Sequence, residues 1–82
     1  MKLPRDLSGA ELAALLRHYG YEITRQTGSH LRLTSTAKGI AHHIAIPQHK
    51  SLKVGTLSAI LADVASYLEI QRERLAEDLF GR

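Results

Sequence analysis

The sequence predicts an α+β fold in which a three-stranded antiparallel sheet is covered on one face by two helices, with a short third helix after them. Apolar residues recur at helical spacing before and after three runs in which apolar and polar residues alternate. Segments containing glycine or proline separate these runs. The chain of 82 residues fits a single domain, residues 1–82, with a core at about 7–68 and a helical extension at about 69–82.

The first helix is expected at about residues 8–19. Ser8 and Glu11 have the spacing of a capping box, in which a hydroxyl and a carboxylate satisfy free amides of the first turn. Gly20 ends the helix, because glycine adopts the left-handed cap conformation without steric cost. One helical face carries the apolar residues Leu12, Leu15, Leu16 and Tyr19.

Two alternating runs, at residues 21–26 and 30–34, predict a β-hairpin with a loop at residues 27–29. A hairpin loop of three residues usually needs one residue in the left-handed conformation, and Gly28 supplies it. The loop therefore has a structural reason for its glycine.

The alternation also predicts a register for the hairpin. We expect Gln26 opposite His30 and Thr24 opposite Arg32, because this register pairs polar side chains with polar side chains. The apolar side chains of both runs, Tyr21 and Ile23 in the first and Leu31 and Leu33 in the second, then share the other face.

A third strand is expected at about residues 41–46. Ile44 and Ile46 face the core, and Pro47 ends the strand because it lacks the amide that a ladder needs. His43 faces outward and is expected across from Arg32. The other sheet face is then polar and open, with Glu22, Thr24, Gln26, His30, Arg32, Thr34 and His43.

A basic loop at residues 48–53 follows the third strand. After Gly55 and Thr56, apolar residues from Leu57 to Leu68 predict a second amphipathic helix. A short third helix at about 71–80 is indicated by Leu75 and Leu79 among polar and charged neighbours.

Composition excludes several classes of protein. The absence of cysteine rules out disulfides and thiolate metal sites, and the 44% apolar content argues against disorder. No apolar run approaches the roughly 20 residues of a membrane span, and the first residues lack the apolar stretch of a signal peptide. We therefore expect a cytoplasmic protein without a membrane partner.

Charge is distributed unevenly along the chain. Residues 1–56 hold eight Lys or Arg against three acids, whereas residues 57–82 hold three against five. A basic first part suits a polyanion such as a nucleic acid. Ordinary solvated surface charge gives the same pattern, so this alternative stays open.

His30 is the candidate for proton transfer. Cleavage of RNA by the ribose 2′-hydroxyl needs a base for that hydroxyl, an acid for the leaving oxygen and positive charge around the phosphorane. Histidine gives and takes protons near neutral pH, and Arg32 follows two residues later on the same face. From spacing alone, a single strand histidine such as His30 is more often an ordinary surface residue.

The other histidines have open roles. His43 is a second acid or base or an exposed spectator, and His42 is expected to be half-buried at the sheet rim. His49 lies with Lys50 and Lys53 in the basic loop, where these side chains and the amides near Gly55-Thr56 offer a phosphate seat. His18 is a solvated helix residue. No histidine pair has ligand spacing, so we expect no metal site and no cofactor.

Several segments together resemble the HicA family, the toxins of HicBA toxin–antitoxin modules. The resemblance covers about Leu7 to Leu68, and each segment alone is weakly specific. The segments are Leu-Ser-Gly-x-Glu-Leu at 7–12, Gly20-Tyr21, Arg25-Gln26-Thr27-Gly28-Ser29-His30, Ile46-Pro47-Gln48-His49, and Val54-Gly55-Thr56-Leu57 with Ile60-Leu61.

The resemblance implies a fold like that of the double-stranded-RNA-binding domain and an activity as a ribosome-independent mRNA interferase. It places the family's catalytic histidine at His30 and implies neutralisation by a HicB antitoxin in a hetero-oligomer. Gly28 and Ser29 then form the turn that places the catalytic residue. The expected RNA-binding or phosphate-stabilising residues are Arg25, Arg32, His49, Lys50 and Lys53.

Two other functions remain open at this point. A non-catalytic RNA-binding module of the same fold would keep the basic surface, and its affinity would fall with salt. An interaction protein would use the open sheet face to bind a partner. The tail after about residue 69 leaves open whether it adds an antitoxin contact, a dimer contact or core.

Overall fold

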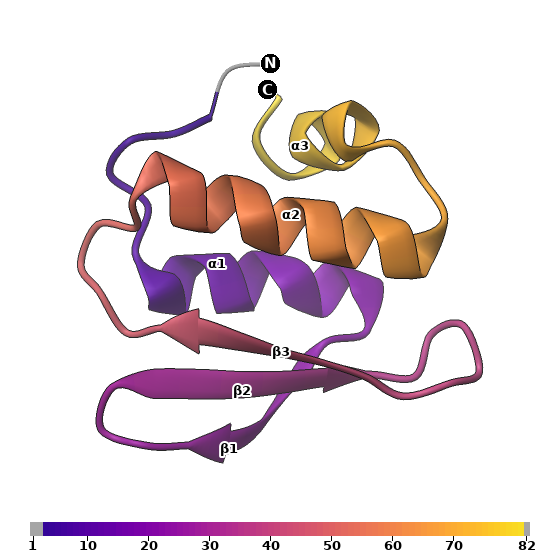
Figure 1. The fold of residues 1–82 in the computed structure, drawn as a ribbon, viewed down its shortest axis with the longest axis horizontal. Helices are drawn as coiled ribbons and strands as arrows, with labels where there is room; N and C mark the ends of the chain where they lie inside the picture. Colours follow the sequence, from indigo (N-terminus) through magenta and orange to yellow (C-terminus); the bar gives the residue numbers. More distant parts are fainter. Residues whose placement is uncertain (1–2, 82) are drawn as a thin grey trace.

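The computed structural model describes residues 3–81 and confirms the predicted order of elements (Figure 1). The strands form one antiparallel sheet in the order β1-β2-β3. The elements are helix α1 (Gly9–Leu16), the 3-10 turn η1 (Arg17–Tyr19), strands β1 (Glu22–Gln26), β2 (His30–Ser35) and β3 (His42–Pro47), and helices α2 (Val54–Leu68) and α3 (Arg72–Phe80).

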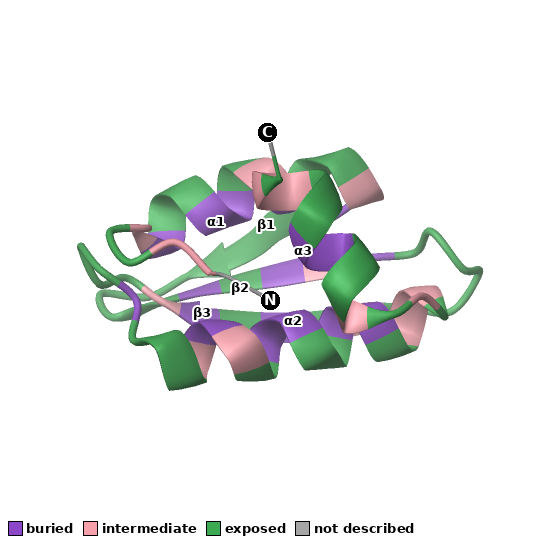
Figure 2. Cartoon of the chain, turned by 90° about the horizontal axis from the view of Figure 1, so that it is seen from above, coloured by how far each residue is buried: buried purple, intermediate pink, exposed green. Residues whose placement is uncertain are grey.

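The helices and the sheet form layers. Helices α1 and α2 lie side by side over one face of the sheet, and α3 lies over them on the side away from the sheet (Figures 1 and 2). The opposite face of the sheet is left open, which confirms the predicted α+β architecture. None of the helices within residues 3–81 has the length and apolar character of a membrane span.

The core fills the space between the sheet and the helices. Inward side chains of β2 and β3, such as Leu33 and Ile46, are fully buried against Leu12 and Leu16 of α1 and against the apolar face of α2. Leu75 of α3 is also fully buried, so the C-terminal helix contributes to the core. Figure 2 shows the burial along the inward faces of the helices.

Helix α1 begins as the sequence predicts. The Ser8 hydroxyl accepts the Glu11 amide at 3.0 Å, and the Glu11 carboxylate accepts the Ser8 amide at 2.8 Å. These two hydrogen bonds lower the pKa of Glu11, and the bond with the Ser8 backbone has the larger effect. The following Gly9 is required because a β-carbon there would lie 2.1 Å from the Pro47 carbonyl oxygen. Helix α1 therefore starts directly against the end of β3.

The predicted hairpin register is correct only at the start of β1. Glu22 pairs with Thr34 and Ile23 with Leu33, but a β-bulge at Thr24 shifts the rest of the strand by one residue. The predicted pairs Gln26–His30 and Thr24–Arg32 are therefore wrong. Gln26 pairs with Leu31 and turns to the helix side of the sheet, and Arg25 pairs with Arg32. A bulge inserts an unpaired residue, so strict alternation cannot reveal it.

The loop at residues 27–29 has the predicted length, but its glycine is not left-handed. Positive φ angles within residues 3–81 occur at Gly20 (84°), Gly39 (86°) and Glu69 (61°), and not at Gly28. A β-carbon at Gly28 would also meet no atom within 4 Å. The loop thus closes without the backbone conformation that the sequence suggested.

Three further details differ from expectation. Strand β3 includes Pro47, which pairs with His30, and begins at His42 rather than at residue 41. Helix α2 begins at Val54 and so includes Gly55 in its first turn. Ile23 lies on the helix side, yet 50% of its surface is exposed. The α1 residues that line the pocket beside Ile23 are alanines, Ala10, Ala13 and Ala14, and their small side chains cover little of it.

Candidate functional site

The open face of the sheet carries its side chains in rows that cross the strands. One row places His30 beside Pro47, and the opposite end of β2 places Thr34 between Glu22 and His43. The middle row is Arg25–Arg32–Ala45. The β-bulge creates this row, because without it Arg25 would point to the helix side.

The two arginines of the middle row are cross-strand neighbours. Like charges directly opposite each other in a sheet destabilise it, and an anion between them removes that cost. No ion pair within residues 3–81 involves Arg25 or Arg32, and both side chains are exposed. The small side chain of Ala45 leaves Arg32 uncovered on its other side. The arrangement can therefore hold a phosphate next to His30.

The imidazole of His30 is held by its neighbour in the chain. Its Nδ1 atom lies 2.9 Å from the Ser29 hydroxyl, while no hydrogen bond within the described residues engages its Nε2 atom. A hydroxyl can donate to Nδ1 or accept from it, so Ser29 is compatible with either tautomer. His30 is exposed on the open face and can exchange a proton at Nε2 with a bound substrate.

The backbone of His30 is held by Thr27 on the other side of the loop. The Thr27 amide donates to the His30 carbonyl at 2.9 Å, and the His30 amide donates to the Thr27 hydroxyl at 3.1 Å. The same hydroxyl donates to the His30 carbonyl at 3.3 Å. Thr27 therefore closes the loop at the point where β2 begins.

Gln48 is a site residue that sequence reasoning missed. Its backbone amide donates to the Ser29 carbonyl at 2.8 Å, and its side-chain amide donates to the Thr27 carbonyl at 2.9 Å. These two bonds join the loop before β2 to the segment after β3. The available signal in the sequence was its place in the segment Ile46-Pro47-Gln48-His49, which carries part of the family resemblance.

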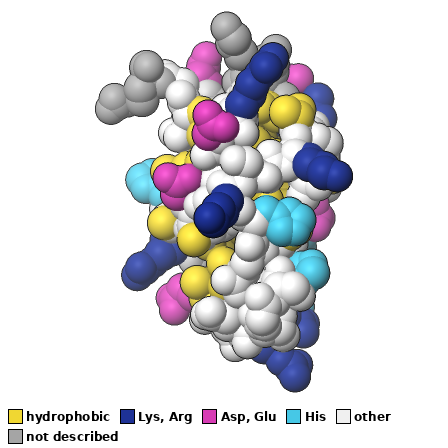
Figure 3. Space-filling model, turned by 90° about the vertical axis from the view of Figure 1, so that its left-hand side faces the viewer, with side chains coloured by type: hydrophobic (Ala, Val, Ile, Leu, Met, Phe, Trp, Pro, Cys, Tyr) yellow, Lys and Arg dark blue, Asp and Glu magenta, His cyan; other side chains and the backbone are white. Residues whose placement is uncertain are grey.

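The basic loop lies at the same end of the molecule as the β1–β2 turn (Figure 1). Lys50, Lys53 and His49 are exposed there. Figure 3, which looks at this end, shows histidine, lysine and arginine side chains with acidic ones among them. The His49 carbonyl accepts the Gly9 amide at 3.0 Å, so its backbone is used to anchor α1.

The first turn of α2 opens toward this loop. Its N-cap residue is Lys53, whose side chain makes no capping hydrogen bond. The first amides of a helix have no acceptor inside the helix and carry the positive end of its dipole. Gly55 has open space around its α-carbon. Gly55 and Thr56, the residues near which a phosphate seat is predicted, therefore lie in the first turn of the helix rather than before it.

The structure does not bring His43 to His30. His43 lies opposite Thr34, not Arg32 as expected, because the third strand is displaced by two residues from the predicted pairing. Thr34 is four positions along β2 from His30, a length of about 14 Å in an extended strand. His43 is therefore outside the reach of a shared proton-transfer step.

His42 lies on the inward side at the rim, as predicted. Its Nδ1 atom is 2.7 Å from the Tyr21 hydroxyl, its Nε2 atom is 3.1 Å from Asp63, and its ring stacks on Tyr67. Burial raises the pKa of Tyr21, so its hydroxyl stays protonated. It donates to Nδ1 of His42 or accepts from it, depending on the tautomer of the imidazole. This network fastens β3 to α2. Within residues 3–81, no three His, Asp or Glu side chains gather as metal ligands would.

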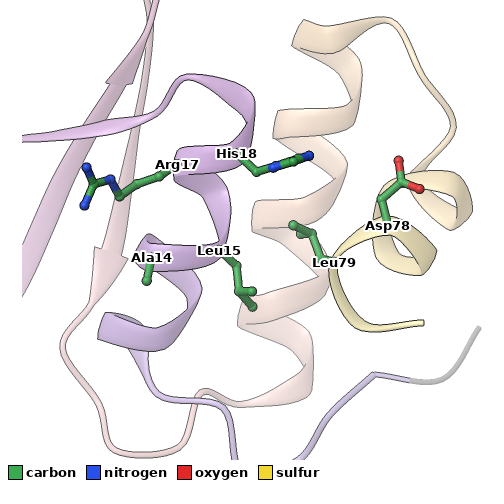
Figure 4. A pocket seen from close by; sticks show the side chains of 6 residues that line it. All are labelled: Ala14, Leu15, Arg17, His18, Asp78 and Leu79. Atoms are coloured by element: carbon green, nitrogen blue, oxygen red, sulfur yellow. The ribbon is translucent and has the colours of Figure 1, made fainter. Parts of the chain in front are cut away.

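A cleft on the helix layer lies apart from these residues. Figure 4 shows Leu15 and His18 on one side of it and Asp78 and Leu79 of α3 on the other, with Arg17 pointing away. The Tyr19 hydroxyl donates to Asp78 at 2.8 Å nearby. The cleft is far from the open sheet face and shares no residue with the His30 site.

Comparisons with known proteins give one family. A family model described as the HicA toxin of bacterial toxin–antitoxin systems matches residues 9–65, more than half of the chain. Searches of curated proteins and of solved structures give no significant match. The matched residues include His30, both arginines of the middle row and the basic loop.

Proposed function

The chain belongs to the HicA toxin family of bacterial toxin–antitoxin systems, and from this membership we propose that it is an endoribonuclease that cleaves mRNA with His30 as general acid or base. The observation that carries the proposal is the position of His30. Its ring is held by Ser29 and stands beside the Arg25–Arg32 pair on an open face.

The proposed reaction is an attack of the ribose 2′-oxygen on the adjacent phosphorus. The bond between phosphorus and the 5′-oxygen breaks, the 2′-oxygen loses its proton, and the 5′-oxygen gains one. The products carry a 2′,3′-cyclic phosphate and a 5′-hydroxyl. The Nε2 atom of His30 transfers one of these two protons. General acid–base catalysis of this kind typically raises the rate 10²–10⁴-fold.

The arginines supply the electrostatic part of the proposal. Charge accumulates on the phosphoryl oxygens in the transition state, and fixed guanidinium groups beside them stabilise it. The positive surface extends along the same end of the molecule to three exposed side chains, Lys50, Lys53 and His49, and to the first amides of α2. We propose that they hold neighbouring phosphates of the same strand.

Imidazole and guanidinium groups can carry this reaction without a metal ion, so we propose a metal-independent enzyme. As a toxin of this family, the protein has an antitoxin as its partner. We propose that this antitoxin is of the HicB type, that it covers the His30 site in a hetero-oligomer, and that both proteins act in the cytoplasm, where mRNA is available.

Cleavage of a labelled RNA in the presence of a chelator tests the proposal. We expect the purified protein to shorten the RNA and to leave cyclic phosphate ends, and His30→Ala to lower the rate by at least about 100-fold. The replacement of an exposed side chain should leave the melting temperature unchanged.

The control variant is His49→Ala, which removes an exposed histidine of the same end but keeps the carbonyl that anchors α1. It should weaken RNA binding and retain cleavage at saturating RNA. If the wild-type protein only shifts the RNA in a gel, it is a binding module. Equal cleavage by folded His30→Ala would exclude His30 as the catalyst.

A further inference from the structure

The row Glu22–Thr34–His43 lies at the far end of the open sheet face from His30. Successive rows of an antiparallel sheet on one face are about 7 Å apart, so the arginine row separates it from His30. A substrate that covers both ends extends over more than one nucleotide. The chemistry of this third row differs from that of the first two.

Three side chains at this end form a hydrogen-bonded chain, which we call the Thr24–Thr34–His43 chain. The hydroxyls of Thr24 and Thr34 are 2.9 Å apart, and the Thr34 hydroxyl is 2.8 Å from Nδ1 of His43. Thr24 reaches this position because it is the bulged residue, and its hydroxyl also contacts the Arg32 carbonyl at 3.4 Å. The Nδ1 atom of His43 is thus held by Thr34, and the residue is exposed.

The charge at this end is unsuited to a phosphate. Glu22 is exposed and lies directly opposite Thr34, whereas the two arginines are in the neighbouring row. Imidazole rings stack on nucleobases, threonine hydroxyls form hydrogen bonds with their edges, and a carboxylate accepts hydrogen bonds from exocyclic amino groups. The row therefore offers groups that recognise a base rather than a phosphate.

We propose that the row Glu22–Thr34–His43 is a nucleobase subsite for single-stranded RNA, a proposal that rests on the proposed function for the identity of the substrate. A base stacks on His43, and the Glu22 carboxylate accepts a hydrogen bond from its amino group. Stacking on one face requires an unpaired base, so double-stranded RNA does not enter. Cytosine, adenine and guanine carry an amino group and are preferred over uracil.

Binding to the His30→Ala protein tests the subsite without cleavage of the probe. The probe is a short fluorescent single-stranded RNA, compared with the same backbone carrying abasic positions. Adding His43→Ala should weaken binding of the intact RNA about tenfold, the scale of one stacked base, and leave binding of the abasic RNA unchanged. His43→Phe keeps a stacking face and should restore most of the affinity.

His18→Ala is the matched control, because His18 is an exposed histidine on the helix layer. It should not change the affinity for either RNA. Glu22→Gln should reduce the preference for cytosine-containing over uracil-containing RNA. The subsite would be overturned if adding His43→Ala to the His30→Ala protein left the affinity for intact RNA unchanged. It would also be overturned if the added change lowered the affinity for intact and abasic RNA equally.

The two proposals fail in different ways. If wild-type protein leaves RNA uncut while binding still depends on His43, the proposed catalysis is wrong and the subsite stands. If wild-type protein cuts RNA and His43→Ala binds and cuts as well as its parent, the subsite is wrong and the catalysis stands. Absence of RNA binding in every variant would overturn both.

Discussion

The backbone amide of Gln48 donates a hydrogen bond to the carbonyl of Ser29 at 2.8 Å, and this bond ties the segment after β3 to the loop that precedes the catalytic candidate His30. The side-chain amide of Gln48 adds a second bond to the Thr27 carbonyl at 2.9 Å. Hydrogen bonds therefore join two segments that are far apart in sequence at the loop directly before His30.

Replacing Gln48 with alanine removes only the side-chain bond of this turn. We expect the free energy of unfolding to fall by about 1 kcal/mol, as for one hydrogen bond, and kcat to fall by about tenfold because the turn loosens. Single-turnover cleavage and thermal unfolding measure the two effects. Gln26→Ala removes an amide side chain that faces the helix side and should change neither quantity. Unaltered cleavage by Gln48→Ala would show that Gln48 does not position His30.

Replacing Ser29 with alanine removes the hydrogen bond to Nδ1 of His30. The ring then rotates more freely, and we expect kcat to fall by about tenfold with little change in KM. Ser29→Thr should restore activity, and Ser66→Ala, on the exposed side of α2, should have no effect. Cleavage by Ser29→Ala at the wild-type rate would show that Ser29 does not orient the His30 ring.

The Arg25–Arg32 pair should show opposite effects on binding and on stability. Arg25→Ala removes one proposed phosphate contact, so the slope of log affinity for RNA against log salt concentration should become shallower by about one. It also removes a like-charge cross-strand pair, so the protein should become more stable by a few tenths of a kcal/mol at low salt. Fluorescence titration and urea unfolding at several salt concentrations measure both. Arg17→Ala, on the helix layer, should leave the salt slope unchanged. A slope for Arg25→Ala equal to that of the wild-type protein would contradict a phosphate contact.

The contact between Tyr19 and α3 should depend on pH in the alkaline range. Burial, and then the hydrogen bond to Asp78, raises the pKa of Tyr19 to about 12, above its ordinary value of 10.0. The folded state thus favours the neutral phenol, and this stabilisation is complete below about pH 10 and is lost as the pH rises toward 12. Urea unfolding should show Tyr19→Phe to be less stable than wild type at pH 8, with the difference shrinking by pH 11. A constant difference would exclude this titration.

The sequence predicted the elements because their signals are local. The capping box at Ser8, the glycine at position 20 and the helical spacing of Leu12 and Leu16 all act within a few residues. The inward positions of Ile44 and Ile46 follow from the strict alternation of a strand. His30 was found by its residue type and by the family resemblance, and both are properties of the sequence.

The tertiary structure decided which of these side chains meet. The bulge at Thr24 reverses the faces of Arg25 and Gln26, and a bulge depends on how two strands fit together rather than on the pattern of either one. The hydrogen bonds of Gln48 to the loop, and the distance of His43 from His30, likewise depend on the register of β3 against β2. By itself the sequence determined the elements, the core and the catalytic candidate, since short-range periodicity and residue chemistry encode them. The arginine pair and the support of His30 depend on pairing between strands, which only the folded chain specifies.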